Sequence, residues 1–487
     1  MLKFDKQRIG GMNVSSKGNS FSDSLIDEII QGAYNILSEI GIRVKDDNIV
    51  GILKEKGFTQ KNDRILIDAT VSRAYFDKHQ CRNQKKNIDV DSQNTDIAYD
   101  GWVNTWPLHY IDHISGKILK YDTASLSAIS RFVNNYCEQE GITPGVPGYP
   151  SDVPPVLETL ARYKIAIENC PAGIEEDPAS FLSAKYMFEM AEVVGRKMEH
   201  TPIYMSTPLT LGGDTVKIAM EFRDRLKSVS VGSMPSFGAS TPLTISGAFA
   251  LVLAENLGGA ILVNALTDLP AYFGASVIPF DFHSLNISYG SPEKLIFDLL
   301  SIEFNAKLRG GKPEVSSVCI HTWAKRPGAQ AAFEKGSQIT AGAMLGAKHF
   351  VGLGALSMDE IFCPIQLVLD VEMMHHVGRM VKGSAVEHMP ENIVEMIQQN
   401  IDRSFLESDL TLDNHSDFIW YPKLFTRDSL SKWQHLKERD ALDEANQIVS
   451  KLWHAEPKYE LDKEQKKEID SIYSKACAEV YPISVPE

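Results

Sequence analysis

The chain has 487 residues, of which 43% are hydrophobic and 23% are charged, a composition typical of folded globular proteins. Its formal net charge of −15 argues against nucleic acid as a partner, because binding to phosphates needs clustered Lys and Arg. Six scattered cysteines without a CxxC pair, and a first segment without an apolar signal region, predict a cytoplasmic protein with reduced thiols.

The first part of the chain predicts helices followed by strands. Apolar residues recur at helical spacing over residues 22–57, and Ser22 is a suitable N-cap. Residues 97–121 are β-rich and predict a hairpin that turns at 113–117, HISGK. We therefore expect an N-terminal helical and hairpin segment over residues 1–124.

From about residue 125, short apolar runs alternate with helical segments. The runs begin near residues 141, 170, 202, 228, 270, 314 and 349, and the helices cover 154–168, 179–196, 213–226, 241–257, 291–307, 328–346 and 364–382. Strands that alternate with helices imply a parallel sheet, and seven such repeats favour a TIM (βα)8 barrel over residues 125–400. The pattern does not place the eighth strand, which the 97–121 hairpin either supplies or caps.

Residues 401–487 predict a C-terminal extension packed on the barrel. It begins as an aromatic, loop-like stretch within 405–456 and continues as a polar helix. The most apolar stretch of the chain, Ile245–Leu266, is nearly long enough to cross a bilayer. Because Glu255 and Asn256 lie near its middle, a buried helix is the better interpretation, and we expect no membrane association.

Six segments, in order along nearly the whole chain, resemble motifs of the trimethylamine methyltransferase family. They are ILSEIGIRVKD at 36–46, PSDVP at 150–154, SMPSFGASTPLT at 233–244, YGSPE at 289–293, HTWAKRPGAQ at 321–330 and WYPKLF at 420–425. The resemblance implies a TIM barrel that gives a methyl group to a soluble corrinoid protein. Cobalamin is then carried by that partner and is not bound permanently in this chain. Large barrels of this type often self-associate, so we also expect a homo-oligomer.

The family is named for enzymes that carry pyrrolysine, and this sequence has standard residues throughout. Family members without pyrrolysine include enzymes that demethylate glycine betaine, proline betaine and carnitine. A quaternary nitrogen is already charged and leaves as a neutral amine, so such an enzyme needs no covalent helper. We therefore expect transfer from a quaternary amine, glycine betaine or a related betaine, to Co(I) of a corrinoid protein. Two alternatives stay open: another methylated amine or a sulfonium donor, and a non-catalytic barrel that binds a betaine.

A strand over 97–106 offers the first candidate residues for a cation site. Period-2 alternation places Asp100, Trp102 and Asn104 on one face, where an acid, an indole and an amide suit a charged headgroup and a polar tail. An ordinary hairpin face exposed to solvent is the alternative. Glu175 begins a run of three acids after the 170 run, which either faces the cation or starts the next helix.

Further candidates follow the later runs. His321, Trp323 and Lys325 lie after the 314 run, where the barrel end would place them at the active site, although Trp323 stands where the family has an acid. Phe280 and Tyr289, in the loop before the 291 helix, suit an aromatic cage or a lid, with core packing as the alternative. Cys319 and His321 alone are too few for a metal site, so we expect no metal.

Overall fold

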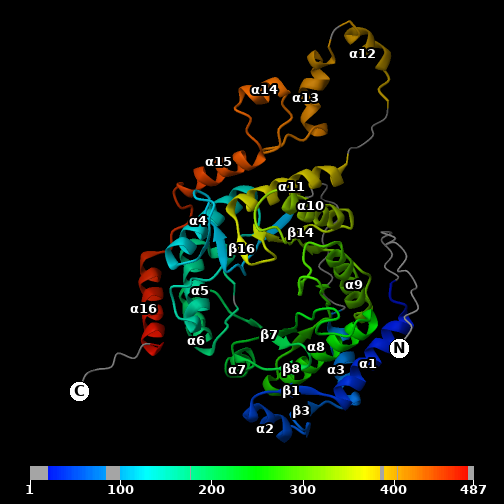
Figure 1. Ribbon diagram of the computed structural model, residues 1–487, viewed down its shortest axis with the longest axis vertical. Coiled ribbons are helices and arrows are strands. Elements are labelled where there is room, and N and C mark those ends of the chain that lie inside the picture. The colour runs from blue at the N-terminus through cyan, green and yellow to red at the C-terminus, as the bar shows by residue number, and fades with distance from the viewer. Residues whose placement is uncertain (1–19, 84–98, 176, 384–388, 403, 481–487) are drawn as a thin grey trace, which may run out of the picture.

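The computed structural model describes residues 20–83, 99–175, 177–383, 389–402 and 404–480. Eight helices follow one another in chain order around a ring (Figure 1). They are α4 (Thr123–Glu140), α5 (Glu158–Asn169), α6 (Phe181–Val193), α7 (Asp214–Glu221), α8 (Ile245–Thr267), α9 (Pro292–Leu308), α10 (Ala329–Met344) and α11 (Pro364–Lys382). Seven of them correspond to helices predicted from the sequence, whereas α4 was not among the predicted helices.

Parallel strands inside the ring form two separate arcs. The strands are β4 (Asp100–Val103), β7 (His200–Ser206), β9 (Ser228–Gly232), β10 (Ala271–Phe273), β13 (Ser317–Cys319) and β14 (His349–Leu353). One arc has the order β10-β9-β7, and the other has the order β13-β14-β4. No ladder joins the two arcs among the described residues, so the fold is mixed α/β with a half-barrel in place of the expected closed sheet.

The pairing of β4 with β14 shows that the first β-rich segment, residues 97–121, supplies a strand of the inner sheet. Asp100 lies opposite His349, and β4 runs parallel to β14, so this strand belongs to the inner sheet. The hairpin is confined to β5 (His109–Ile111) and β6 (Ile118–Lys120), which pair antiparallel around the predicted HISGK turn. The domain division at residue 124 stays a prediction. The inner sheet itself begins before that boundary, at Asp100.

Two predicted strands do not form. The run at 141 contributes only a bridge between Thr143 and Trp102. The run at 170 forms a short 3-10 helix, η2 (Pro171–Gly173). Pro171 has no N–H to donate to a neighbouring strand, and its fixed φ suits the start of a helical turn. These two departures interrupt the second arc where the sequence predicted continuous strands.

The N-terminal segment covers the first arc. Its elements are α1 (Asp23–Glu39), β1 (Ile42–Val44), α2 (Asp47–Glu55), β2 (Thr59–Lys61), β3 (Arg64–Leu66) and α3 (Ala69–Asn83), and β1 pairs with β8 (Thr210–Leu211). Ser22 caps α1 as predicted. The expectation of helices throughout 22–57 was wrong at β1. The chain turns at Gly41, whose φ is 75° and where a Cβ would meet the Ile65 oxygen at 2.3 Å.

Helix α8 is the core helix of the first arc. It is long and apolar enough to cross a membrane by length and composition, but 78% of that window is buried inside the protein. Its Glu255 accepts hydrogen bonds from Thr207 Oγ1 at 2.7 Å and from the Leu209 N–H at 2.6 Å. Its Asn256 donates to the Gly274 carbonyl at 2.7 Å. The two polar residues therefore hold the segments that leave β7 and β10, which confirms the buried-helix interpretation.

The C-terminal extension is largely helical. It contains α12 (Ile393–Asn400), η3 (Phe405–Glu407), α13 (Asp409–Phe418), α14 (Leu430–His435), α15 (Ala441–Trp453) and α16 (Lys463–Val480). The loop-like interpretation of its first part was therefore wrong for α13 and α14. Helix α15 packs on α4 and α11, and α16 packs on α5 and α6, whereas α12 and α13 project beyond the ring (Figure 1).

Two buried glutamates attach the ends of the chain to the ring. Glu372 of α11 accepts the Lys423 and Leu424 N–H groups at 2.9 and 3.1 Å. Glu303 of α9 accepts the Phe21 N–H at 3.0 Å in the same way. Four short strands complete the fold: β11 (Phe280–Asp281) with β12 (Asn286–Ile287), and β15 (Ala355–Leu356) with β16 (Ile361–Phe362).

Candidate functional site

The face of β4 singled out from the sequence points into the ring. Gly101 lies against the outer layer, since a Cβ there would meet Leu353 at 2.4 Å and Met374 of α11 at 3.1 Å. Because side chains alternate along a strand, Trp102 faces inward, as do its neighbours two residues away. The predicted set of Asp100, Trp102 and Asn104 therefore lines the inner wall.

The strand register places these residues at different heights. Trp102 lies level with Val351 and Cys319 across β14 and β13, and Asp100 lies level with His349 one layer lower. Asp100 and Asn104 are thus about 13 Å apart along the strand. Only Asn104 and Trp102 approach the carboxyl ends, where active sites of such sheets form.

Asp100 is engaged by protein groups at its lower position. Its carboxylate accepts from the Thr143 N–H and hydroxyl, each at 3.1 Å, and lies 3.0 Å from Nδ1 of His349. Asn104 contrasts with it: the side chain is 4% exposed, and its Nδ2 has no hydrogen-bond partner in the structure. A buried amide without a partner is costly, so Asn104 is a candidate to donate to a ligand.

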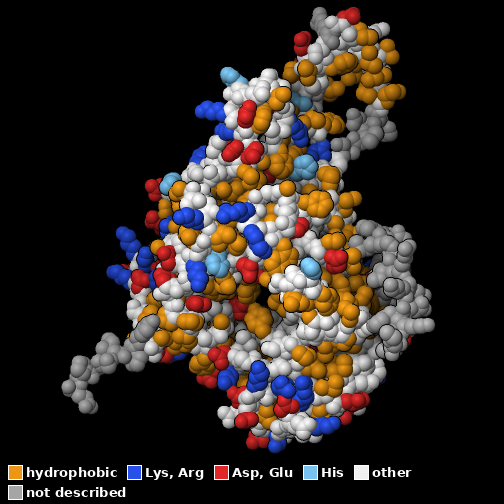
Figure 2. Space-filling model, in the orientation of Figure 1, with side chains coloured by type: hydrophobic (Ala, Val, Ile, Leu, Met, Phe, Trp, Pro, Cys, Tyr) orange, Lys and Arg blue, Asp and Glu red, His pale blue; other side chains and the backbone are white. Residues whose placement is uncertain are grey.

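The inner wall is open to solvent and not packed. Tyr204 of β7 is 47% exposed and Tyr272 of β10 is 46% exposed, although the residues on either side of Tyr204, Ile203 and Met205, are buried. The space-filling view is correspondingly hollowed near its centre, inside the ring of helices (Figure 2). Aromatic side chains therefore face an accessible interior.

An acidic and aromatic group of side chains lines one side of this interior. Glu175 is paired with Arg162 at 2.5 Å and accepts from the Thr105 hydroxyl at 2.7 Å. Arg162 also donates to the Tyr149 hydroxyl at 3.0 Å. Because Thr105 directly follows Asn104 at the end of β4, this network joins β4 to α5 and to the segment after η2. Glu175 is thus already neutralised by a buried cation.

Asp177, a second carboxylate on this side of the interior, is bound by a hydroxyl group and not by a cation. It accepts a hydrogen bond from the Tyr204 hydroxyl at 2.7 Å, and burial raises the pKa of its carboxyl. A raised pKa means that the protein supplies too little compensation for the charge, which a bound cation would provide. Residue 176, the middle acid of the predicted run, lies outside the described residues.

A second group of polar side chains surrounds His321. The His321 and Tyr289 rings lie 4.6 Å apart between centroids, and Lys294 lies 5.2 Å from the Tyr289 ring centre. Lys294 is itself paired with Asp298 at 2.5 Å. Burial, with Lys294 and Lys335 nearby, lowers the pKa of His321 to about 3, so the imidazole is neutral at pH 7. Its Nδ1 is buried without a hydrogen-bond partner.

The other predicted residues lie around the rim. Trp323 donates from Nε1 to the Ile287 carbonyl at 3.0 Å, and exposed Lys325 lies 4.5 Å from its ring centre. Phe280 packs edge-on against Phe282 at 5.3 Å in the β11–β12 hairpin. The hairpin and the loop after β13 are therefore joined at Trp323. The structure thus brings together Tyr289, Trp323 and His321, and it places Phe280 in the adjoining hairpin.

Two supporting groups were not predicted from the sequence. Glu334 of α10 accepts from the Thr322 hydroxyl and, at 2.9 Å, from the Trp323 N–H. Lys335 and Asp370 form a fully buried ion pair at 2.6 Å between α10 and α11. No local motif marks these residues, because their partners are distant in sequence; charged residues within otherwise apolar helices were the available signal.

The Lys335–Asp370 pair holds the end of β14. Lys335 donates to the Gly352 carbonyl at 3.1 Å, and Asp370 accepts from the Gly354 N–H at 2.8 Å. Gly354 has a φ of 77°, and a Cβ there would lie 2.4 Å from Phe362. The pair therefore fixes a glycine turn directly beside the level of His321.

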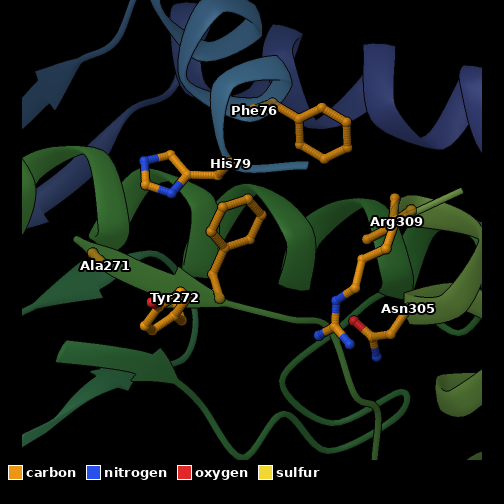
Figure 3. A pocket seen from close by; sticks show the side chains of 8 residues that line it. Phe76, His79, Ala271, Tyr272, Asn305 and Arg309 are labelled. Atoms are coloured by element: carbon orange, nitrogen blue, oxygen red, sulfur yellow. The ribbon is translucent and has the colours of Figure 1, made fainter. Parts of the chain in front are cut away.

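Two hollows lie apart from the predicted mouth residues. Figure 3 shows Phe76 and His79 of α3 on one side of β10 and Tyr272 on the other side of that strand, with Asn305 and Arg309 side by side. That pocket holds about 30 Å³, room for about one or two waters. A cleft of about 910 Å³ extends from Ser233 and Gly274 to Arg309 and Lys312, where the two arcs are unpaired. Its lining residues include the segment after β10 and the segment before β13.

Within the described parts of the chain, no group of three or more His, Cys, Asp or Glu side chains is arranged to hold a metal ion. Burial also raises the pKa of the Cys319 thiol, which faces the interior. A thiol with a raised pKa is a poor nucleophile at neutral pH. The inner wall presents aromatic faces, carboxylates and hydrogen-bonding groups.

Comparison with known proteins identifies the family. The profile described as Trimethylamine methyltransferase (MTTB) matches residues 184–480, more than half of the chain. The chain belongs to the trimethylamine methyltransferase family. It is 25% identical over 405 residues to trimethylamine methyltransferase MttB2 of Methanosarcina mazei, covering 81% of this chain and 75% of that one. It is 21% identical over 438 residues to glycine betaine methyltransferase of Desulfitobacterium hafniense, covering 86% and 88%.

A solved structure is also similar. The monomethylamine methyltransferase MtmB of Methanosarcina barkeri aligns with a TM-score of 0.46 at 11% identity, over 95% of this chain and 90% of that one. Membership of the trimethylamine methyltransferase family, together with relatives named as methyltransferases, identifies the chain as an enzyme that transfers methyl groups.

Proposed function

We propose that this family member transfers a methyl group from a quaternary amine bearing a carboxylate, glycine betaine or a related betaine, to Co(I) of a corrinoid protein. The observation that carries the proposal is that two complementary groups of side chains, one for a cation and one for an anion, line the inside of the same ring. Tyr204 and Asp177 offer an aromatic face and a carboxylate, while Asn104 and His321 offer unpartnered polar groups. A zwitterion with a cationic head and an anionic tail needs both.

Aromatic faces and acids hold the cationic head in this proposal. The exposed ring of Tyr204 and the inward indole of Trp102 present π-faces, which attract quaternary ammonium by about 0.5 to 2 kcal/mol each. Asp177 adds opposite charge, while Glu175, neutralised by Arg162, orders the wall beside it. The raised pKa of Asp177 falls back when the cation binds, because the ammonium compensates the buried carboxylate.

Hydrogen-bond donors hold the anionic tail. Asn104 lies about two strand spacings from the His321 column, roughly 10 Å across β14. A neutral His321 carries one ring N–H, and Asn104 Nδ2 carries two, so both can donate to a carboxylate. The proposed substrate-facing residues are Trp102, Asn104, Glu175, Phe280, Tyr289, His321, Trp323 and Lys325. Asp100 supports them from the layer below through Thr143 and His349.

The reaction needs little from the protein beyond orientation. The electron pair of Co(I) forms the new bond to the methyl carbon, and the electrons of the breaking C–N bond stay on nitrogen. The amine leaves neutral, so no proton is added and no protein nucleophile takes part. The side chains hold the cation with one methyl group directed outward and keep water from it. Trp323 and Lys325 at the rim are placed to limit that water.

The remaining parts of the proposal concern context. We propose that the two arcs represent a (βα)8 barrel whose carboxyl ends receive the corrinoid protein, since these ends carry Asn104 and His321. The corrinoid is a substrate brought by that partner and is not resident in this chain. We also place the protein in the cytoplasm, where such partners and reduced cysteines are found.

The test incubates the purified chain with Co(I) cobalamin and a panel of methylated compounds. Formation of methylcobalamin and dimethylglycine from glycine betaine, or the equivalent products from a related betaine, is the expected result. Consumption of trimethylamine while no quaternary amine reacts would refute the proposal. Transfer from a sulfonium compound alone would support the second donor class, and tight betaine binding without transfer would indicate a binding protein.

A further inference from the structure

The cleft beside β10 and β13 is large enough to hold a small molecule. Its volume of about 910 Å³ falls within the range of ligand-binding clefts, roughly 300 to 1,000 Å³. The segments that follow β9 and β10 line one end, and the segment between α9 and β13 lines the other. Serines, asparagines and glycines make up most of the lining, so the cleft suits a polar ligand.

Two asparagines in the cleft hold the segment after β10 in different ways. Asn305 of α9 uses its whole amide, since its Oδ1 accepts from the Ala275 N–H at 2.9 Å and its Nδ2 donates to the Ala275 carbonyl at 2.6 Å. Asn256 of α8 donates from Nδ2 to the Gly274 carbonyl at 2.7 Å, but its Oδ1 has no hydrogen-bond partner. Because Asn256 is only 3% exposed, this Oδ1 is a buried acceptor that lacks a donor.

Ser233 adds a second unpartnered group at the same end of the cleft. It directly follows β9, and its Oγ is buried without a hydrogen-bond partner. A buried polar atom without a partner costs free energy unless a ligand or a water molecule satisfies it. Hydroxyl groups suit this end of the cleft, because a hydroxyl donates to an amide oxygen such as Asn256 Oδ1 and accepts from another hydroxyl.

The opposite end of the cleft carries positive charge. Arg309 and Lys312 are exposed there, and neither forms an ion pair with a described residue. Glu314 is the one acid among the described lining residues, so cations outnumber acids in the cleft of a chain whose net charge is −15. The dipole of α9 accounts for a cation at its C-cap, Arg309, but this effect falls off before Lys312. Figure 3 shows Arg309 beside Asn305, the fixed part of the wall.

We propose that this cleft is a second ligand site, for a small anion that carries hydroxyl groups. Arg309 and Lys312 hold the anionic group, a carboxylate or a phosphate, while Asn256 and Ser233 bond to the hydroxyl groups. The ligand joins the two arcs, which no ladder connects among the described residues, so its binding stabilises the fold. None of the proposed substrate-facing residues lines the cleft, and the inference does not depend on the methyl donor.

The test titrates the full chain with hydroxylated anions by calorimetry and follows its melting temperature. Ribose 5-phosphate and glycerol 3-phosphate represent the phosphates, and gluconate and malate represent the carboxylates. At least one of them should bind with a dissociation constant below about 1 mM and raise the melting temperature, because a ligand that binds only the folded state stabilises it. The class that binds identifies the anionic group, and inorganic phosphate serves as the anion without carbon-bound hydroxyl groups.

Two sets of variants probe the two ends of the cleft. Arg309→Met with Lys312→Met should weaken binding about tenfold or more, because charge-assisted hydrogen bonds to the anion are lost. Lys54→Met with Lys56→Met is the matched control: it removes two exposed cations from the C-terminal end of α2 and should leave the affinity unchanged. Ser233→Ala should weaken binding about threefold or more without lowering the melting temperature of the free protein, because its hydroxyl has no protein partner to lose.

Four results would overturn the inference. The first is that none of the four hydroxylated anions binds at about 10 mM. Inorganic phosphate that binds as tightly as all of them would indicate an adventitious ion only. Equal affinity in the Arg309/Lys312 and Lys54/Lys56 double variants would place the binding elsewhere. Loss of glycine betaine affinity in the Arg309/Lys312 variant would assign the cleft to the substrate site. None of these measurements uses a corrinoid, so failure of methyl transfer would count against the proposed function alone.

Discussion

Trp102 and Asp100 lie on the same face of β4 but in different surroundings. The indole is level with the inward Cys319, near the carboxyl ends, while the carboxylate lies one layer lower and is already bonded to Thr143 and His349. Alternation along a strand predicts which side chains share a face, but it says nothing about height relative to the site. That difference makes the two residues useful opposites in an experiment.

Trp102→Ala should weaken binding of the quaternary amine about tenfold or more, because loss of about 1.4 kcal/mol from a desolvated aromatic face is a factor of ten. Asp100→Asn should change affinity less, since its partners are protein groups. Substrate titration alongside melting temperatures measures both effects. Trp106→Ala is the control: it deletes the same side chain at a position that is 42% exposed. Equal affinity in all variants would show that Trp102 is an ordinary packing residue and does not contact the substrate.

His321 predicts a pH dependence of stability. Its pKa is about 3 in the folded protein, below the ordinary value of 6.5, because burial disfavours the imidazolium ion. The unfolded chain therefore binds the additional proton between these values, so stability is full above pH 6.5 and falls as the pH drops toward 3. His321→Gln should flatten this part of the stability profile in urea unfolding between pH 5 and 7. Parallel profiles for the two proteins would contradict the assignment.

At the scale of elements, α10 and α11 are joined beneath the site by Lys335 and Asp370. Both side chains are fully buried, so each charge depends on the other and on nearby backbone groups. Lys335→Met should destabilise the fold by about 3 to 5 kcal/mol, because it leaves a carboxylate buried without its partner. Adding Asp370→Asn should recover much of that loss, since a neutral amide still accepts from Gly354. A double-mutant cycle in urea measures the coupling, and additive losses would show that the pair is not coupled.

The elements also show why helices were easier to predict than strands. Apolar residues at helical spacing located seven of the eight ring helices, including α8 with its internal Glu255, but not α4. The run at 170 has the apolar composition of a strand, yet Pro171 cannot join a ladder and a 3-10 turn forms. Contacts such as Arg162 with Glu175, or Glu334 with Trp323, join residues whose proximity depends on the final fold, so composition and spacing did not predict them.

At the scale of the whole molecule, the ring separates two kinds of surface. The interior holds aromatic, acidic and unpartnered polar groups, whereas α12 and α13 offer exposed apolar side chains away from it. A small substrate and a transient partner are therefore proposed at the carboxyl ends. The family motifs located the methyltransferase function, but α12 and α13 were not anticipated, because the aromatic residues before 425 were interpreted as a loop.

Four glutamates inside the helices, Glu255, Glu303, Glu334 and Glu372, bind crossing stretches of chain through backbone N–H groups. A bond from a backbone N–H does not depend on the side chain of the crossing stretch, so that stretch can change its sequence more freely than the acid, except at Thr207 and Thr322, whose hydroxyls also donate to Glu255 and Glu334. Over evolutionary time these four acids should persist as isolated invariant positions in variable surroundings. Isolated invariant acids are easily mistaken for catalytic residues. In this fold they mark the positions where a helix holds another segment of the chain by hydrogen bonds.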